Sequence, residues 1–150
     1  NGVLPFTNLE NHPGNDLYYY NPFAFNLMNR FEYLSDKYAG ISVEHNIGSG
    51  LFRFIPITRK LKWRQFYTVK SLWGSLSSAN EAANSYAVIP YPKVYSFKTL
   101  NNKTYIEVGT GIDNIFKVFR LDFVWRLSPS TAYAGTQNKF GVFGSFQIQF

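Results

Sequence analysis

Apolar and polar positions alternate along several stretches of this chain, most clearly over residues 140–150. Successive side chains of a β-strand point to opposite faces, so residues two apart share a face. In this stretch one face would carry Phe140, Val142, Gly144, Phe146, Ile148 and Phe150. We therefore predict a strand here with one apolar face.

The same period predicts five further strands. Residues 23–33 would place mostly aromatic side chains on one face, with Arg30 and Glu32 on the other. The other four would cover residues 39–47, 65–76, 105–112 and 119–127. We expect turns at 35–37 and 113–114 and long loops over 77–103 and 128–139. Residues 51–64 break the alternation and predict a basic amphipathic loop or helical turn.

The charged residues fall on the face opposite the aromatic ones, which would suit the polar lumen of a membrane barrel. The predicted lumen-facing charges are Arg30, Glu32, Glu44, Lys70, Glu107, Arg120, Asp122 and Arg126. A soluble sandwich would instead turn such charges to water and its aromatics inward. The predicted fold class is therefore all-β, an antiparallel transmembrane β-barrel.

The number of predicted strands is too small for a complete barrel, since six were found and an isolated barrel needs about eight. Either two more strands lie in residues 1–20 and 86–100, or the chain continues a larger barrel. We expect the second, with residues 1–150 forming the C-terminal part of one barrel domain. The start at Asn1-Gly2-Val3, without Met or a signal peptide, fits a processed product or a fragment.

Composition agrees with a strand-rich envelope protein. Aromatic residues make up 19% of the chain, which favours strands and the aromatic girdles of membrane barrels. The net charge of +6 would permit contact with nucleic acid or anionic lipid. We expect the excess cations to lie in loops and lumen, and we predict no nucleic-acid partner.

Candidate catalytic chemistry is sparse. The two histidines, His12 and His45, are far apart, and cysteine is absent, so we predict no metal site, cofactor or catalytic residues. Gly109-Thr110-Gly111 lacks the Lys-Ser/Thr of a phosphate loop and fits close packing within a strand. The chain is predicted to be non-enzymatic.

Two groups of charged residues suggest binding or structural roles. Arg120, Asp122 and Arg126 could form a cross-strand ladder with Glu107, either as a satisfied polar interior or as a pore lining. The basic loop could contact an acidic partner or lipid head groups, or could be a solvated turn. Its cations are Arg53, Arg59, Lys60, Lys62 and Arg64.

The pattern of Gly144, Phe146, Ile148 and Phe150 resembles the C-terminal β-signal that bacterial barrel-assembly machinery recognises. The whole chain also resembles Bacteroidota outer-membrane proteins that carry a carboxypeptidase-regulatory-like domain ahead of a barrel of unassigned function. The matching stretches are 11–15, 24–33, Glu44-His45, 59–64, 105–109 and 114–117. This resemblance implies upstream domains and strands, and it implies no reaction.

The predicted function is that of an outer-membrane barrel, a structural subunit or partner in an envelope assembly, export or transport complex. Its partners would be outer-membrane lipid, the barrel-assembly machinery and other envelope proteins. With Phe150 at the periplasmic end, segment 49–64 would be periplasmic and loops 77–103 and 128–139 extracellular. The alternatives are a soluble calycin-like barrel that binds a small apolar ligand, and a carbohydrate- or nucleic-acid-binding β-domain.

Overall fold

The computed structural model describes residues 3–84, 98–129 and 139–146, apart from the side chains of Leu51 and Arg59. Antiparallel strands dominate this part of the chain, which confirms the all-β class. The elements are η1 (Phe6–Asn8), β1 (Glu10–Asn11), β2 (Leu34–Ser35), β3 (Lys37–Asn46), η2 (Gly50–Phe54), α1 (Pro56–Leu61), β4 (Arg64–Ser75), α2 (Ser78–Ala83), β5 (Thr104–Ile115), β6 (Phe119–Ser128) and β7 (Phe140–Phe146).

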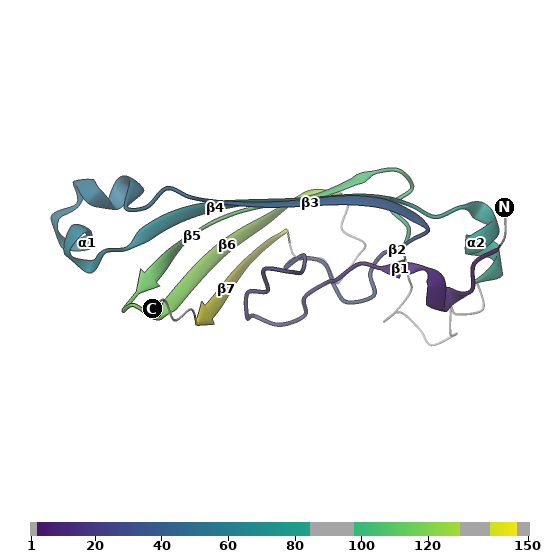
Figure 1. Cartoon of the computed structure of the whole chain (residues 1–150), viewed down its shortest axis with the longest axis horizontal. Helices are drawn as coiled ribbons and strands as arrows, with labels where there is room; N and C mark the ends of the chain where they lie inside the picture. Colours follow the sequence, from purple (N-terminus) through teal and green to yellow (C-terminus); the bar gives the residue numbers. More distant parts are fainter. Residues whose placement is uncertain (1–2, 85–97, 130–138, 147–150) are drawn as a thin grey trace.

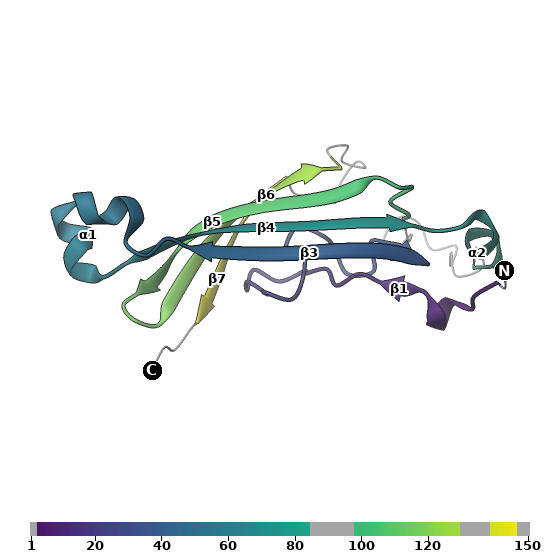
Figure 2. The same cartoon turned by 45° about the horizontal axis from the view of Figure 1, so that its top comes forward.

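Five strands form one antiparallel sheet in chain order, β3-β4-β5-β6-β7, while β1 and β2 pair separately (Figures 1 and 2). Strands β4 and β5 stay in register from Arg64↔Asp113 to Trp73↔Thr104. Strands β5 and β6 carry register shifts near both ends of their pairing. Within the described residues the sheet is open, so closure into a barrel stays a prediction.

The sheet has two faces of opposite character. Its outer face carries Ile41 and Val43 of β3, Tyr67, Val69 and Trp73 of β4, Ile106, Val108 and Ile112 of β5, Phe119, Leu121, Phe123, Trp125 and Leu127 of β6, and Phe140, Val142 and Phe146 of β7. Among the Lys, Arg, Asp and Glu residues of these described strands, only Lys37 at the start of β3 points outward. The inner face holds Lys70, Glu107, Arg120, Asp122 and Arg126, all buried.

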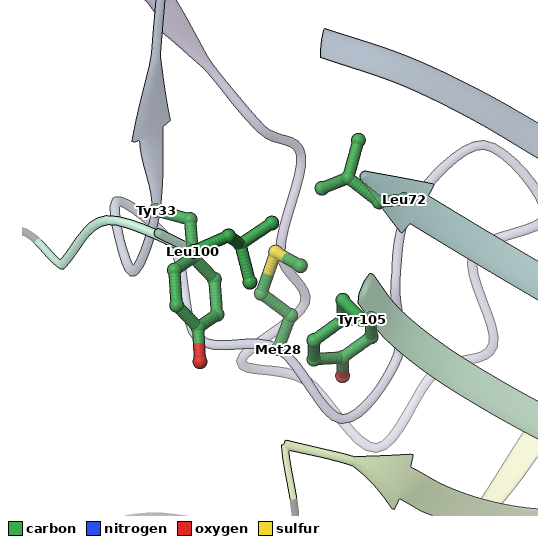
Figure 3. Close-up of a cluster of buried hydrophobic side chains, with 5 residues drawn as sticks. All are labelled: Met28, Tyr33, Leu72, Leu100 and Tyr105. Atoms are coloured by element: carbon green, nitrogen blue, oxygen red, sulfur yellow. The ribbon is translucent and has the colours of Figure 1, made fainter. Parts of the chain in front are cut away.

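The N-terminal segment, residues 3–36, lies along part of the inner face, as both views show (Figures 1 and 2). It packs there through a small apolar cluster of Met28 and Tyr33 with Leu72, Leu100 and Tyr105 (Figure 3). A second cluster joins its Tyr20 and Leu27 to Val124 and Phe143. The molecule's interior therefore lies between the N-terminal segment and the sheet.

The strand predicted over residues 23–33 is wrong. Three successive turns replace it, closed by bonds from Ala24 N–H to the Asn21 carbonyl, from Met28 N–H to the Phe25 carbonyl and from Glu32 N–H to the Asn29 carbonyl. Asparagine side chains favour such turns because they bond nearby backbone groups. Asn26 does so here, since its Oδ1 accepts the N–H of Asn21.

The other predicted strands are confirmed over the described residues, with small changes at their ends. Strand β5 continues to Ile115, so the chain turns at 116–118 and not at 113–114. The turn expected at 35–37 is present as a bend at Asp36 that connects β2 to β3. These two strands do not pair with each other, because β2 pairs with β1. Helix α2 was not predicted within 77–103, whereas η2 and α1 confirm the helical turn expected within 51–64. None of the helices in the described ranges is long and apolar enough to cross a membrane.

Candidate functional site

A row of alternating charges crosses the inner face of the sheet. Lys70 on β4 lies opposite Glu107 on β5, which lies opposite Arg126 on β6. All three side chains are buried, with exposed fractions of 5%, 2% and 5%. Burying charged side chains costs free energy unless they are paired and hydrogen-bonded. The contacts of these three residues therefore indicate the structural role of the row.

Glu107 binds the backbone of the N-terminal segment. Its carboxylate accepts the N–H groups of Asn26 at 3.0 Å and Leu27 at 2.6 Å. It also accepts the hydroxyl of Tyr105, its neighbour on the same face of β5. Two consecutive backbone donors are thus satisfied by one buried carboxylate, which fixes the chain direction at residues 26–27.

Lys70 holds the same segment from the other side. Its ammonium donates to the carbonyl oxygens of Asn21 at 3.1 Å, Pro22 at 3.0 Å and Ala24 at 2.6 Å. A lysine has three N–H donors, and each of them has an acceptor here. Lys70 and Glu107 therefore form a clamp, in which a cation binds carbonyls and an anion binds N–H groups of one loop.

Arg126 completes the row at the next turn of the segment. Its guanidinium donates to the Glu32 carboxylate at 3.2 Å and to the Tyr33 hydroxyl at 2.8 Å. The Glu32 carboxylate also lies 3.7 Å from the Lys98 ammonium. Residues 32–33 are thereby held against β6, the strand next to the Glu107 side of the clamp.

A second charged group lies further along the inner face, around Arg120 of β6. Its guanidinium forms a paired contact with Glu44 at 2.9 and 2.8 Å and contacts Asp122 at 2.8 Å. It also stacks 3.7 Å from the centre of the Phe66 ring. Gly111 permits this packing, because a Cβ there would collide with the Phe66 ring and the Leu121 carbonyl.

Tyr20 links this second group to the N-terminal segment. Its buried ring lies 4.8 Å from the Arg120 guanidinium and 5.0 Å from the Lys70 ammonium. Burial, followed by the nearby Asp122 carboxylate, raises the pKa of the Tyr20 hydroxyl above its usual range, so it stays neutral. An aromatic ring close to two cations contributes a further attraction.

The predicted charged residues do not all lie on the inner face. Glu32 is buried but lies in the N-terminal segment rather than on a strand, whereas Glu44 of the edge strand faces inward and contacts Arg120. Arg30 is largely exposed and lies 3.9 Å from Asp16, because the strand that would have carried it inward is absent. Gly144 and Phe146 lie on the outer side of β7, and Ile148 and Phe150 are outside the described residues.

The basic loop divides into two parts. Arg53, Lys60 and Lys62 are exposed, and the side chain of Arg59 lies outside the described part. Arg64 instead turns inward and makes two hydrogen bonds to Asp113, at 2.8 and 3.0 Å. Arg64 is therefore neutralised within the sheet and does not belong to the exposed cations.

Several residues of the site were missed from the sequence. Tyr105 and Asp113 share the parity of Glu107 on β5, so the period-two pattern could have found them. The period-two pattern could not have found Asn26 or Tyr20. Asn26 lies in a turn, and Tyr20 is placed by contacts with residues far away in the sequence. No group of three metal-ligating side chains occurs among the residues that the structure describes.

His12 lies in the N-terminal segment and packs against β2 and β3. Its Nε2 lies 2.9 Å from the Ser35 hydroxyl, and its ring packs edge-on against Tyr38 of β3. Burial lowers the pKa of His12, although the nearby Glu10 carboxylate acts in the opposite direction. A released His12 would take up a proton near its ordinary pKa of about 6.5, which the docked side chain resists.

We therefore predict that docking of residues 10–15 weakens as the pH falls from about 7.5 to about 5. Amide hydrogen exchange, corrected for its intrinsic pH dependence, measures this change. In a His12→Gln variant the protection of the same amides should no longer depend on pH over that range. An equal decline in both proteins would mean that another group is responsible.

No family model, curated protein or solved structure matched the chain in the comparisons with known proteins.

Proposed function

We propose that the chain is the C-terminal part of a larger outer-membrane β-barrel, non-enzymatic, acting as a structural subunit or partner in an envelope complex. The single observation that carries the proposal is the polarity of the sheet. Its outer face is mostly apolar across the five strands, with Lys37 as the only outward Lys, Arg, Asp or Glu of the described sheet, while charged side chains are buried beneath the opposite face. Strands of membrane barrels have this arrangement, with apolar residues toward lipid and polar residues toward the lumen.

The exposed side chains argue for a nonpolar solvent. Ile41, Tyr67 and Leu127 are 62%, 44% and 54% exposed on the outer face. A continuous apolar surface of this extent is unusual in soluble monomers and marks a site of contact. Transferring it into hydrocarbon would be favourable, since each square ångström of apolar surface removed from water contributes about 25 cal/mol.

The free edge of β3 supports a larger barrel. All ten residues of β3 are exposed, and in the described part of the chain β3 pairs only with β4. Unpaired backbone groups in lipid cost several kcal/mol each, so this edge needs another strand. Strands from upstream of residue 1, as the family resemblance implies, would supply it.

The clamped N-terminal segment favours a structural role over an open pore. In a barrel the inner face borders the lumen, and here residues 3–36 cover part of that face. The clamp charges bind that segment's backbone instead of lining an aqueous path. Gly144 and Phe146 also have the parity that a C-terminal signal for barrel assembly requires.

A soluble calycin-like barrel is less well supported. Such a protein would line its interior with the apolar side chains and turn its charges to water. Here a groove of about 510 Å³ lies between the N-terminal segment and β3, lined by residues such as Phe23, Phe25 and Tyr38. The large apolar surface, however, lies on the other face of the sheet.

The proposal is tested by expressing the parent gene with its own signal sequence and isolating outer membranes. We expect the protein to resist carbonate extraction and to change its mobility on an SDS gel after boiling. Recovery in the soluble fraction with unchanged mobility would contradict the membrane assignment. If the protein is found in the outer membrane, co-purification from mild detergent would identify its envelope partners.

A further inference from the structure

The connection between β3 and β4 folds into η2 and α1 at one end of the sheet (Figures 1 and 2). Internal contacts hold it together. The Phe52 ring packs edge-on against Trp63 at 5.8 Å, and the Thr58 hydroxyl contacts the Phe52 carbonyl at 2.8 Å. This packing leaves Phe54 and Ile57 outside, with exposed fractions of 70% and 74%.

The turn between β5 and β6 contacts the connection between β3 and β4. The Asn114 side chain donates to the Lys62 carbonyl at 2.8 Å, which places the turn beside α1. The turn adds an exposed Phe116 and an exposed Lys117. We name the combined exposed residues the end surface: Phe54, Ile55, Ile57, Leu61 and Phe116, with the cations Arg53, Lys60, Lys62 and Lys117.

The end surface is basic as well as apolar. No Asp or Glu occurs between residues 45 and 80, so the connection brings no acidic residue to its own cations. Arg53 lies 4.7 Å from the Phe54 ring centre, so its charge lies directly beside an exposed aromatic side chain. Cations interleaved with large exposed apolar side chains are typical of segments that lie in a membrane interface.

We propose that the end surface docks on anionic phospholipid head groups, with Phe54 and Ile57 entering the acyl boundary. The inference rests on the proposed membrane sheet, because that sheet holds the end surface at one bilayer interface. A membrane fits better than an acidic protein, since the apolar outer face of the sheet would already be in the same bilayer. Basic residues near an anionic leaflet are attracted, and exposed aromatic and aliphatic residues gain from burial there.

The absence of cysteine from the sequence allows single-site labels. An environment-sensitive fluorophore on an Ile57→Cys variant reports the end surface, and the same label on Val108→Cys reports the centre of the sheet. Both proteins are reconstituted into vesicles of phosphatidylcholine alone or mixed with phosphatidylglycerol. We expect blue-shifted emission at position 108 in both vesicles, and at position 57 chiefly in the anionic ones.

Charge variants test the cause. Lys60→Gln with Lys62→Gln removes two cations from the end surface. Lys37→Gln with Lys103→Gln removes two exposed lysines from outside the end surface and serves as the matched control. At about 1 kcal/mol per cation, the first pair should reduce the docked-to-undocked ratio about 30-fold. The control pair should leave it unchanged.

The two labels separate the two proposals. Water-like emission at position 108 would contradict the membrane sheet, while position 57 would still report binding to added anionic vesicles. Water-like emission at position 57 in both vesicles, or an equal response in both lysine pairs, would overturn the docking inference. In that case the cations would be available to an acidic protein partner.

Discussion

Replacing Glu107 with alanine is expected to lower the free energy of unfolding by about 3–5 kcal/mol and to release the N-terminal segment. The carboxylate is 2% exposed and accepts the N–H groups of Asn26 and Leu27. Its removal leaves those donors and the Tyr105 hydroxyl buried without an acceptor. It also leaves the buried Lys70 without the anion opposite it. Each uncompensated group adds its own desolvation cost.

The effect is measured by denaturant unfolding in detergent micelles and by protease sensitivity of residues 20–35. A Glu81→Ala variant is the control, because Glu81 is exposed on α2 and its loss should change stability by less than about 1 kcal/mol. Glu107→Gln keeps the shape and one acceptor oxygen and should fall between the two. If Glu107→Ala behaved like Glu81→Ala, the clamp would not hold the segment.

Replacing Val108 with arginine is expected to cost about 2–4 kcal/mol in a bilayer. Val108 lies on the outer face near the middle of β5, the central strand of the sheet. A charge at that depth would have to leave water or deform the membrane. In an aqueous protein, where this half-buried outer position would border water, the same change should alter stability by only about 0.5 kcal/mol.

Leu127→Arg is the matched control for depth. Leu127 also points outward, but it lies one residue from the end of β6. Costs for arginine near the membrane interface fall to about 0–1 kcal/mol. Unfolding in lipid vesicles compares the two variants, and we expect Val108→Arg to lose clearly more stability than Leu127→Arg. Equal costs at both positions would indicate that the two residues do not lie at different depths in a membrane.

The long strands were predictable because their local pattern agrees with the final structure. In β6, large apolar residues recur at every second position from Phe119 to Leu127, and the structure buries the side chains between them. Such a pattern fixes both the strand and its faces without knowledge of remote contacts. The location of Arg120 and Arg126 on one face follows from it.

The N-terminal segment was not predictable in the same way. Phe23, Phe25 and Leu27 have strand spacing, yet the backbone there is set by Lys70 and Glu107, which are 46 to 81 residues away. Partners at that distance leave no periodic trace in the segment itself. The bonds between the charged row and the loop backbone could therefore be found only from the structure.

Helix α2 was missed for a different reason. Its sequence, Ser78–Ala83, is short and polar and resembles a loop. The Asp36 carboxylate accepts the Ser77 N–H and the Asn80 side-chain amide, which fixes the start of the helix. The Ser77 side chain is the main cause that holds the pKa of Asp36 below its usual range, and the bonds from the Ser77 N–H and the Asn80 amide lower it further.

The most direct test of the proposed membrane sheet is a spin-label scan along β5 in reconstituted vesicles. Single cysteines at the outward positions 106, 108, 110 and 112 would be probed with oxygen, which concentrates in lipid, and with a water-soluble nickel complex. We predict that labels replacing Ile106, Val108, Thr110 and Ile112 are accessible to oxygen and protected from the nickel complex. Access of the nickel complex to the even-numbered positions would contradict the account.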